Sequence, residues 1–462
     1  MNIQFHGGAR CVTGSMHRLE VGGKRFLLEC GLFQGKRDEA EAKNRNFPFR
    51  PSEIDAVVLS HAHIDHSGNL PGLVRQGFRG PIFATPATAD LGGVLLRDSA
   101  MIQERDVEYV NFRRQEQGLP PRFPLYRLPD AEAAAERFEP VRYWEPKEIL
   151  PGVTLTFLDA GHILGSAIVS LRLREQDVER RLVFTGDLGV KDAPILRDPE
   201  PAGAADVFVT EGTYGDRDHG KPEALQDSLF AVLHRTFERG GRVVIPAFAV
   251  GRTQLVIHTL RLLWEEGRLP NIPVYVDSPL AVNATEVFRR HPECYDEEMM
   301  EEFRRGNPFG FDRLTYIQSV EESKALNDVR GPCVILSASG MCEHGRILHH
   351  LAAAVGSRRN TILIVGYQAR ETLGRRFVEG ARTVRIFGEE HVLEAEVAVL
   401  DGFSAPAARA ALLEYASPFA REGSSIYVVH ADPAPGQALV KALEALGGAN
   451  VRFPKPGESF DL

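Results

Sequence analysis

The stretch AVVLSHAHIDHSG, residues 56–68, places three histidines and an aspartate directly after a run of apolar residues. Its first four residues are all apolar, which is typical of a strand buried on both faces. In an extended chain His61 and His63 share one side, and the following turn swings Asp65 and His66 towards a second point. Neutral imidazole and carboxylate are ligands of zinc and similar divalent ions. The stretch therefore predicts a metal site at the end of a strand.

Three further residues of the same ligand types each follow an apolar segment elsewhere in the chain: His162, Asp187 and His430. Strands that end at one edge of the sheets would bring these side chains together with the first cluster. A single histidine after a strand is more often structural. We predict one shared site because histidine or aspartate occurs at four separate strand ends, and not because of any one of these residues alone.

Length and composition indicate a globular protein of more than one domain. The chain has 462 residues, and at about 150 residues per domain this predicts two or three. Hydrophobic residues make up 43% and charged residues 25%, which excludes disordered, collagen-like and membrane-spanning chains. No long apolar run and no signal-peptide pattern is present, so we expect a cytoplasmic protein without a membrane partner. The five scattered cysteines lack a CxxC pair, which argues against a disulfide framework.

The formal net charge of −9 excludes a protein that holds nucleic acid through a globally basic surface. A polyanion would have to be held locally, by metal ions, by the N-termini of helices or by a few arginines.

The order of predicted elements suggests one domain inserted into another. Residues 1–205 are rich in short strands, with a long helix expected from residue 88 to about residue 111. Residues 206–384 alternate strands and helices, as in βαβ units around a parallel sheet. Short strands return in residues 385–462 and are expected to complete the first domain.

At this point the sequence resembles a known family. The pattern HxHxDH at residues 61–66 is the signature of the metallo-β-lactamase superfamily. Five later motifs resemble its β-CASP nucleases: EGTYGDR at 211–217, PAFAVGRTQ at 246–254, DSPLA at 277–281, SASGMC at 337–342 and GYQA at 366–369. The resemblance covers almost the whole chain. It implies an α/β fold, namely a metallo-β-lactamase αββα sandwich with an inserted β-CASP domain built on a parallel sheet.

The resemblance also implies two zinc ions, although manganese or iron would accept the same nitrogen and oxygen ligands. The implied ligands are His61, His63 and His162 for one ion, Asp65, His66 and His430 for the other, and Asp187 as a bridge. Such a pair would share a hydroxide that attacks phosphorus in line. Asp65 would also orient the nucleophile or accept its proton. Glu211 would support the proton donor to the leaving group, and Glu29 would hold the metal loop through hydrogen bonds to the ligands.

The implied substrate is single-stranded RNA, and six residues are candidate contacts: Arg252, Ser337, Ser339, Gly340, His349 and Tyr367. Arg252 follows a strand at the start of a predicted helix, where an anion is favoured. Each candidate also has a purely structural interpretation, as a tight turn, a solvated or packed helix face, or an aromatic packed at a strand end. The resemblance does not distinguish an endonuclease from a 5′→3′ exonuclease, and a homodimer is compatible with the sequence.

One position departs from the family pattern. Where the family has a histidine after Phe-Ser-Ala, this chain has Pro406. In the family that histidine, near the Glu211-type carboxylate, assists the leaving 3′ oxygen, and proline has no proton to donate. General acid assistance is typically worth about 10²–10⁴-fold. Three functions therefore stay open: a ribonuclease, a catalytically weakened scaffold that binds RNA or protein, and a small-molecule metallo-hydrolase.

Overall fold

The computed structural model describes the chain except for residues 36, 219–224, 367, 370 and 404–406. The chain divides into two compact units, Met1–Asp218 with Ala405–Leu462, and His219–Ser404. The boundaries expected after residues 205 and 384 thus fall too early. β11 (Val207–Glu211) stays with the first unit because it pairs with two strands of that unit, and β19 (Glu396–Val399) stays with the second because it pairs with β16.

The first unit contains two mixed sheets. In spatial order the first consists of β22 (Ser459–Asp461), β1 (Asn2–Gly7), β2 (Met16–Val21), β3 (Lys24–Leu28), β4 (Ala56–Val58), β5 (Ile82–Ala84) and β6 (Phe138–Pro140). The second consists of β21 (Val451–Arg452), β20 (Ser425–Val429), β11, β10 (Val178–Phe184), β9 (Ala167–Glu175), β8 (Val153–Asp159) and β7 (Lys147–Leu150). Aromatic rings join their facing sides, with Phe5 5.2 Å from Tyr427 and His17 5.7 Å from Phe184 between ring centroids.

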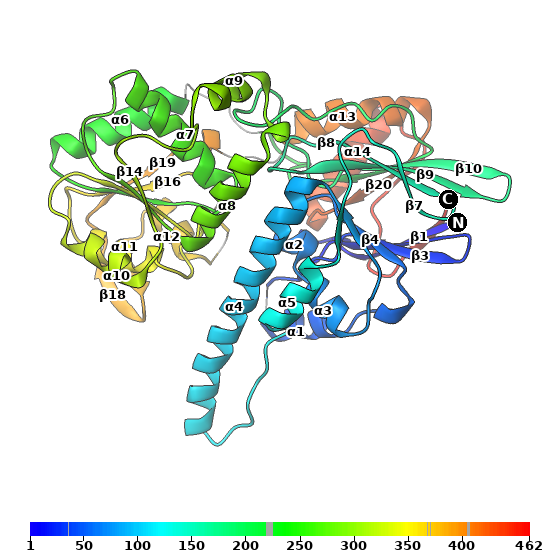
Figure 1. The fold of residues 1–462 in the computed structure, drawn as a ribbon, viewed down its shortest axis with the longest axis horizontal. Coiled ribbons are helices and arrows are strands. Elements are labelled where there is room, and N and C mark those ends of the chain that lie inside the picture. The colour runs from blue at the N-terminus through cyan, green and yellow to red at the C-terminus, as the bar shows by residue number, and fades with distance from the viewer. Residues whose placement is uncertain (36, 219–224, 367, 370, 404–406) are drawn as a thin grey trace. The chain divides into compact units, whose positions relative to one another are not determined.

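Helices cover the outer faces of the two sheets. The helices beside the first sheet are α1 (Arg37–Arg45), α2 (Ile64–Ser67), α3 (Leu70–Arg75), α4 (Pro86–Glu116) and α5 (Leu128–Ala135), and those beside the second are α13 (Arg409–Glu422) and α14 (Pro433–Ala445) (Figure 1). One apolar core joins β3, β4 and β5 to α3, α4 and α5, and another joins the second sheet to α13 and α14. The predicted αββα sandwich is confirmed.

The second unit is built on a parallel sheet, as predicted. Its strands in spatial order are β14 (Leu314–Ile317), β13 (Val274–Asp277), β15 (Val334–Ser337), β12 (Val243–Pro246), β16 (Thr361–Ile364) and β19. All their pairings are parallel. β12, β15 and β16 are buried along their whole length, which explains their nearly continuous apolar sequences.

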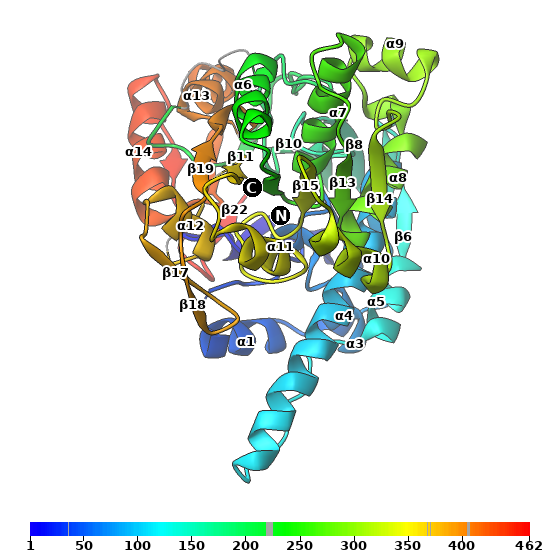
Figure 2. The same ribbon diagram turned by 90° about the vertical axis from the view of Figure 1, so that its left-hand side faces the viewer.

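Helices lie on both sides of this sheet (Figure 2). They are α6 (Leu225–Glu238), α7 (Arg252–Glu265), α8 (Pro279–Arg290), α9 (Glu297–Arg305), α10 (Val320–Ala325), α11 (Ile347–Ala354) and α12 (Leu373–Val378). A hairpin of β17 (Thr383–Ile386) and β18 (Glu389–Val392) follows α12. Within the described part of the chain, none of the helices has the length and apolar character needed to cross a membrane.

Candidate metal centre

The loop that carries the HxHxDH pattern is held by two backbone segments, one just before β2 and one just after β3. Cys30 donates its N–H to the carbonyl of His66 at 2.8 Å, and Ser15 donates to the carbonyl of Asp65 at 2.8 Å. A Cβ on Gly31 would collide with that carbonyl of Asp65, so the close approach requires glycine. The loop is thus fixed by hydrogen bonds before any side chain binds a ligand.

Three histidines of the first unit form one cluster of nitrogens. Nδ1 of His63 lies 3.1 Å from Nε2 of His61 and 3.3 Å from Nε2 of His162. His61 and His162 are buried and come from different loops, one after β4 and the other after β8. The structure therefore brings together the three residues predicted to hold the first ion.

The other three predicted ligands form a second cluster. Nε2 of His66 lies 3.2 Å from Nε2 of His430, which in turn lies 3.5 Å from Oδ2 of Asp65. His430 follows β20 in a left-handed backbone conformation, with φ of 47°, and its N–H donates to the carbonyl of Gly8 at 2.6 Å. This turn points the ring towards a loop more than 360 residues earlier in the sequence.

Asp187 lies between the two clusters and presents one oxygen to each. Its Oδ2 lies 3.7 Å from Nε2 of His162 and 3.8 Å from Nε2 of His61. Its Oδ1 lies 3.4 Å from Nε2 of His66 and 3.3 Å from Nδ1 of His430. A carboxylate in this position can ligate two cations at once.

The distances between these ligand atoms fit cation coordination. Four ligands at the Zn–N distance of about 2.0–2.1 Å around a tetrahedral ion lie roughly 3.3–3.4 Å apart. The nitrogen–nitrogen distances of 3.1, 3.2 and 3.3 Å match this value closely. The described residues form four overlapping groups of possible ligands, and two of these groups match the predicted sets: His61, His63, His162 and Asp187, and Asp65, His66 and His430. The residues therefore fit a pair of divalent cations of the zinc, manganese or iron type.

Polar residues behind the ligands fix which ring nitrogen faces the centre. Nδ1 of His66 donates to Oε2 of Glu29 at 2.8 Å, and Oε1 of the same carboxylate accepts the N–H of Ser60 at 2.7 Å. Nδ1 of His61 lies 3.0 Å from Oγ of Ser60. With Nδ1 engaged, Nε2 of each ring is left as a ligand atom, and this is the usual way in which a protein orients a metal-binding histidine.

Two residues with this supporting position were missed from the sequence, Ser60 and Thr213. Oγ1 of Thr213 lies 3.2 Å from Nδ1 of His430. Both hydroxyls adjoin residues that the sequence did single out, since Ser60 precedes the histidine loop and Thr213 lies in the EGTYGDR motif. A hydroxyl residue beside a predicted ligand was the available signal.

Within the centre, burial favours a neutral His61, whereas nearby carboxylates favour positive charge at His430. Burial, followed by neighbouring histidines, lowers the pKa of His61 well below its ordinary value. Neutral imidazole is the form that binds a metal. Burial would also lower the pKa of His430, but Asp187, Asp65 and Glu211 together raise the pKa of His430 to about 10. Three carboxylates thus converge where the second cation would bind.

Glu211 lies at the end of β11, directly behind this centre. It is 1% exposed, and its Oε1 accepts the N–H of Leu188 at 2.7 Å. One of its oxygens lies within 4.8 Å of ligand atoms of both Asp187 and His430. Burial raises the pKa of Glu211, while hydrogen bonding to Thr213 and the charge of His430 oppose that rise. This position suits a residue that acts through its neighbours.

Four of the predicted substrate contacts, Arg252, Ser337, Ser339 and Gly340, lie in the second unit at or beyond the carboxyl ends of β12 and β15. Arg252 is the first residue of α7, and a Cβ on Gly366, after β16, would lie 3.6 Å from its Nε. After β15, a Cβ on Gly340 would lie 2.9 Å from the ring of Phe248, after β12. The structure therefore brings the loops after β12, β15 and β16 together.

The other predicted contacts differ in what their side chains already bind. Oγ of Ser337 donates to the carbonyl of Asp277 at 2.7 Å, whereas Oγ of Ser339 accepts, among the described residues, one long contact of 3.5 Å from the N–H of Glu343. His349 is exposed on α11, with its ring 4.6 Å from that of Phe387. Tyr367 and Pro406 lie outside the described residues.

Comparisons with known proteins agree in sequence and in fold. Residues 10–233 match the family model of the metallo-beta-lactamase superfamily, and residues 253–377 match that of the Beta-Casp domain. The chain is 39% identical to Ribonuclease TTHA0252 of Thermus thermophilus over 100% of both proteins. It is also 33% and 32% identical to the Transcription termination factors FttA of Methanosarcina mazei and Methanocaldococcus jannaschii, over 92% and 94% of this chain.

The chain spans about two thirds of the length of those termination factors, 66% and 67%. Among solved structures, a protein of unknown function from Enterococcus faecalis has a TM-score of 0.55 at 12% identity, with 100% of this chain and 99% of that chain covered. This likeness shows a shared fold.

Proposed function

The chain belongs to the β-CASP family of the metallo-β-lactamase superfamily and is a metal-dependent hydrolase of that nuclease family; from this premise we propose that it hydrolyses phosphodiester bonds of single-stranded RNA with two zinc ions. The observation that carries the proposal is the position of Asp187, whose two oxygens face two separate clusters of ligand atoms. A single-ion site would not need a carboxylate shared in this way.

Each group of residues has a distinct part in the proposed reaction. His61, His63 and His162 would hold one ion, Asp65, His66 and His430 the other, and Asp187 both. When bound, the two ions would activate water and offset the charge on the phosphate oxygens. Oδ2 of Asp65, 3.5 Å from Nε2 of His430, lies at the centre and would orient the attacking water or take its proton.

Glu211 and Glu29 are proposed as positioning residues. Glu211 is anchored by the N–H of Leu188 and lies close to Asp187 and His430, so it would fix the second cluster. Glu29 is anchored by the N–H of Ser60 and would fix the ring of His66. Neither carboxylate needs to touch substrate for its loss to displace the ligands.

RNA is the proposed substrate because of the relatives and because of the second unit. One relative is named a ribonuclease and others transcription termination factors, and both names concern RNA. In open α/β sheets, ligands bind beyond the carboxyl ends of the strands, where the loops with Arg252, Ser339 and Gly340 lie. We propose that this edge contacts RNA. Cytoplasmic location and a homodimer stay predictions.

One observation favours a second candidate, a weakened paralogue that binds RNA without efficient cleavage. Pro406 stands where the family pattern has a histidine that assists the leaving group, and proline cannot donate a proton. The complete ligand set favours the hydrolase, since a scaffold has no need of two groups of converging ligands.

The test combines metal analysis with three substrates. Purified protein is loaded with zinc, analysed for bound metal, and assayed on 5′-phosphorylated single-stranded RNA, the matching DNA and bis-p-nitrophenyl phosphate. The proposal expects two zinc ions per chain and preferential cleavage of RNA. Two tightly bound ions with no cleavage of RNA would establish the scaffold instead. Rapid hydrolysis of bis-p-nitrophenyl phosphate without RNA cleavage would establish a small-molecule hydrolase.

A further inference from the structure

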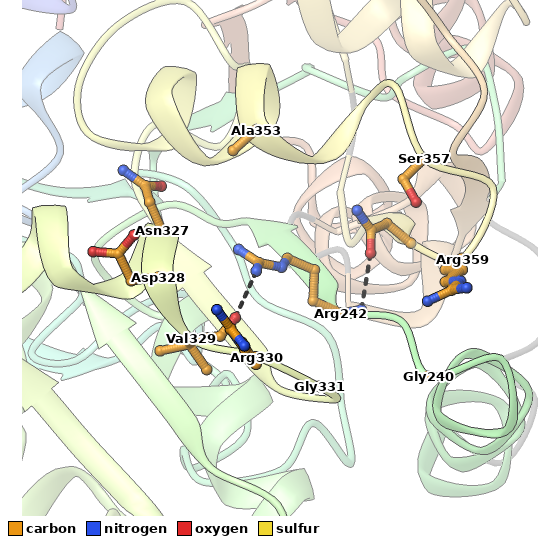
Figure 3. A pocket seen from close by; sticks show the side chains of 11 residues that line it. Gly240, Arg242, Asn327, Asp328, Val329, Arg330, Gly331, Ala353, Ser357 and Arg359 are labelled. Carbon is orange, nitrogen blue, oxygen red and sulfur yellow. Dashed lines mark hydrogen bonds between the residues drawn. The ribbon is translucent and has the colours of Figure 1, made fainter.

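A polar cavity of about 650 Å³ opens at the amino edge of the parallel sheet in the second unit (Figure 3). It is lined by the segments that precede β12, β15 and β16, together with the end of α11. The predicted substrate contacts after β12 and β15 lie at the opposite, carboxyl edge of the same sheet. The cavity is therefore separate from those loops.

The lining carries excess positive charge. The lining contains three arginines, Arg242, Arg330 and Arg359, and one carboxylate, that of Asp328. This leaves two net positive charges in a chain whose net charge is −9. The cavity is thus a local basic site of the kind that an acidic protein needs in order to hold a polyanion.

The arginines of the cavity differ from two others in the same unit, for which the structure shows an acidic partner. Arg235 and Arg239, on the same unit, both bind the carboxylate of Glu396 at 2.6 Å. Within the described parts of the chain, no ion pair involves the three guanidinium groups of the lining. Their charges are therefore available to a ligand.

Arg242 is held in place as a binding group. Its backbone N–H donates to Oδ1 of Asn360 at 3.1 Å, and one end of its guanidinium donates to the carbonyl of Val329 at 2.9 Å (Figure 3). The residue is half-buried. A guanidinium fixed in this way loses less entropy when it binds a second acceptor, and its fork geometry suits phosphate oxygens.

The lining indicates which part of a nucleic acid is bound. Among the described residues around the cavity, none is aromatic, so no ring is present on which a base could stack. Recognition of free nucleotides and of specific RNA bases commonly uses such stacking. Guanidinium and amide groups without aromatic rings favour the phosphates of a chain, whatever its sequence.

We propose that this cavity binds phosphates of the RNA backbone, as an anchoring subsite at the amino edge of the β-CASP sheet. The inference rests on the proposed function, because it takes RNA as the substrate. The subsite gives this acidic protein local attraction for RNA that does not depend on base sequence. It involves no chemical step.

The experiment compares two charge-matched double variants of the full, zinc-loaded protein. Arg330→Gln with Arg359→Gln removes two charges from the cavity. Arg304→Gln with Arg382→Gln removes two charges from exposed arginines elsewhere in the second unit, which form no ion pairs within the described residues. Binding is measured by fluorescence anisotropy with a labelled single-stranded RNA whose phosphorothioate linkages resist hydrolysis, over a series of salt concentrations.

We expect the cavity variant to reduce the slope of log K against log salt by about 1.4, because each lost phosphate contact on single-stranded RNA contributes about 0.7. Its affinity should fall to a similar degree for uridine-rich and adenine-rich RNA, and the control variant should keep the parental slope. Hydrolysis of bis-p-nitrophenyl phosphate should be unchanged in both variants.

Two results would overturn the inference, and they are distinguishable. If the parent binds and cleaves RNA but both variants show the parental slope, the cavity is not a subsite and the proposed function stands. If the parent hydrolyses bis-p-nitrophenyl phosphate but neither binds nor cleaves RNA, the proposed function fails and the inference fails with it.

Discussion

Polar side chains differ between the metal centre of the first unit and the carboxyl edge of the sheet in the second unit. The difference is whether their polar atoms stay available to a ligand or form hydrogen bonds within the fold. At the metal centre the supporting groups engage one nitrogen of a ring and leave the other facing further ligand atoms at 3.1–3.3 Å. At the sheet edge the hydroxyl of Ser337 donates a hydrogen bond to the carbonyl of Asp277 and so serves the fold. Polar residues after strands thus divide into those that shape a loop and those that leave ligand atoms available.

The largest effect on activity is expected from substituting a side chain that lies close to two other predicted ligands of the metal centre. His63→Ala removes the nitrogen that lies near both His61 and His162. We expect the variant to lose one zinc ion per chain. The rates of hydrolysis of RNA and of bis-p-nitrophenyl phosphate should fall at least about a thousandfold, because a metal supplies several kcal/mol of transition-state stabilisation. Metal analysis and steady-state kinetics measure the two losses.

A histidine outside the centre serves as the control. His234 is exposed on α6 and lies 3.7 Å from Glu238. His234→Ala should keep both ions and the parental rate. Parental activity in His63→Ala would mean that the clusters do not form the reaction centre.

The second prediction concerns the position that departs from the family pattern. Pro406→His introduces a proton donor at a position where the parent has none, and we expect RNA cleavage to rise by about a hundredfold, at the lower end of the range for general acid catalysis. Bis-p-nitrophenyl phosphate should be hydrolysed at the parental rate, since p-nitrophenolate leaves without a proton. Single-turnover kinetics on both substrates test this, and an unchanged or lower rate on RNA would refute our account of the missing donor.

The sequence predicted the parts of the molecule that depend on local pattern. The apolar runs gave the buried strands of both units, and the helix expected over residues 88–111 is α4 (Pro86–Glu116). The HxHxDH loop is compact in sequence, so the clustering of its side chains was predictable, and the strand ends before His162 and His430 indicated the side chains that join it. The contact between Glu29 and Ser60 was not predictable in detail, because it joins two loops through a backbone N–H.

The domain boundaries were harder to predict because they depend on pairing between distant segments. The segment with β11 looks like the start of a βαβ series, yet β11 pairs with β20 more than 200 residues later. The segment with β19 resembles the short strands of the first unit, yet it extends the parallel sheet. Composition does not change at either point, so the sequence contains no local signal for them.

The third prediction contrasts the ligand histidines with a histidine that is equally buried but lies outside both clusters. Burial, with smaller contributions from His6 and His430, lowers the pKa of His17 to about 3. Below the ordinary pKa of 6.5, the unfolded chain takes up a proton that native His17 does not. His17 therefore contributes stability above pH 6.5, and this contribution is lost as the pH falls towards 3.

At pH 5 the loss amounts to about 2 kcal/mol, since each pH unit below 6.5 costs about 1.4 kcal/mol. His17→Phe should fit the aromatic surroundings formed by Phe5 and Phe184 and should remove this part of the pH dependence. Urea unfolding at pH 7.5 and pH 5 measures the difference. Equal losses of stability in parent and variant would contradict it.

The fourth prediction tests the support behind the metal centre. Glu29→Gln keeps the size of the side chain but weakens its hydrogen bonds with His66 and the N–H of Ser60. We expect the affinity for one zinc ion to fall about tenfold or somewhat more, within the range for lost ligand support. Competition with a chelator measures this affinity. Glu20→Gln, at a surface ion pair with Arg25, is the matched control and should not change it.

The smallest effects should separate the two kinds of polar residue at the sheet edge. Ser337→Ala loses the hydrogen bond with the carbonyl of Asp277, so the free energy of unfolding should fall by about 1 kcal/mol while the KM for RNA stays within about twofold. Among the described residues, the hydroxyl of Ser339 makes only a long contact of 3.5 Å with the N–H of Glu343, and we expect it to bind phosphate. Ser339→Ala should raise the KM for RNA about tenfold with little change in stability, because hydrogen bonds to charged groups are worth about 1.5–3 kcal/mol. The opposite result, a changed KM in Ser337→Ala and a change of stability alone in Ser339→Ala, would contradict this prediction. A hydrogen bond between the side chain and the rest of the protein would then not distinguish structural residues at this edge from residues that bind substrate.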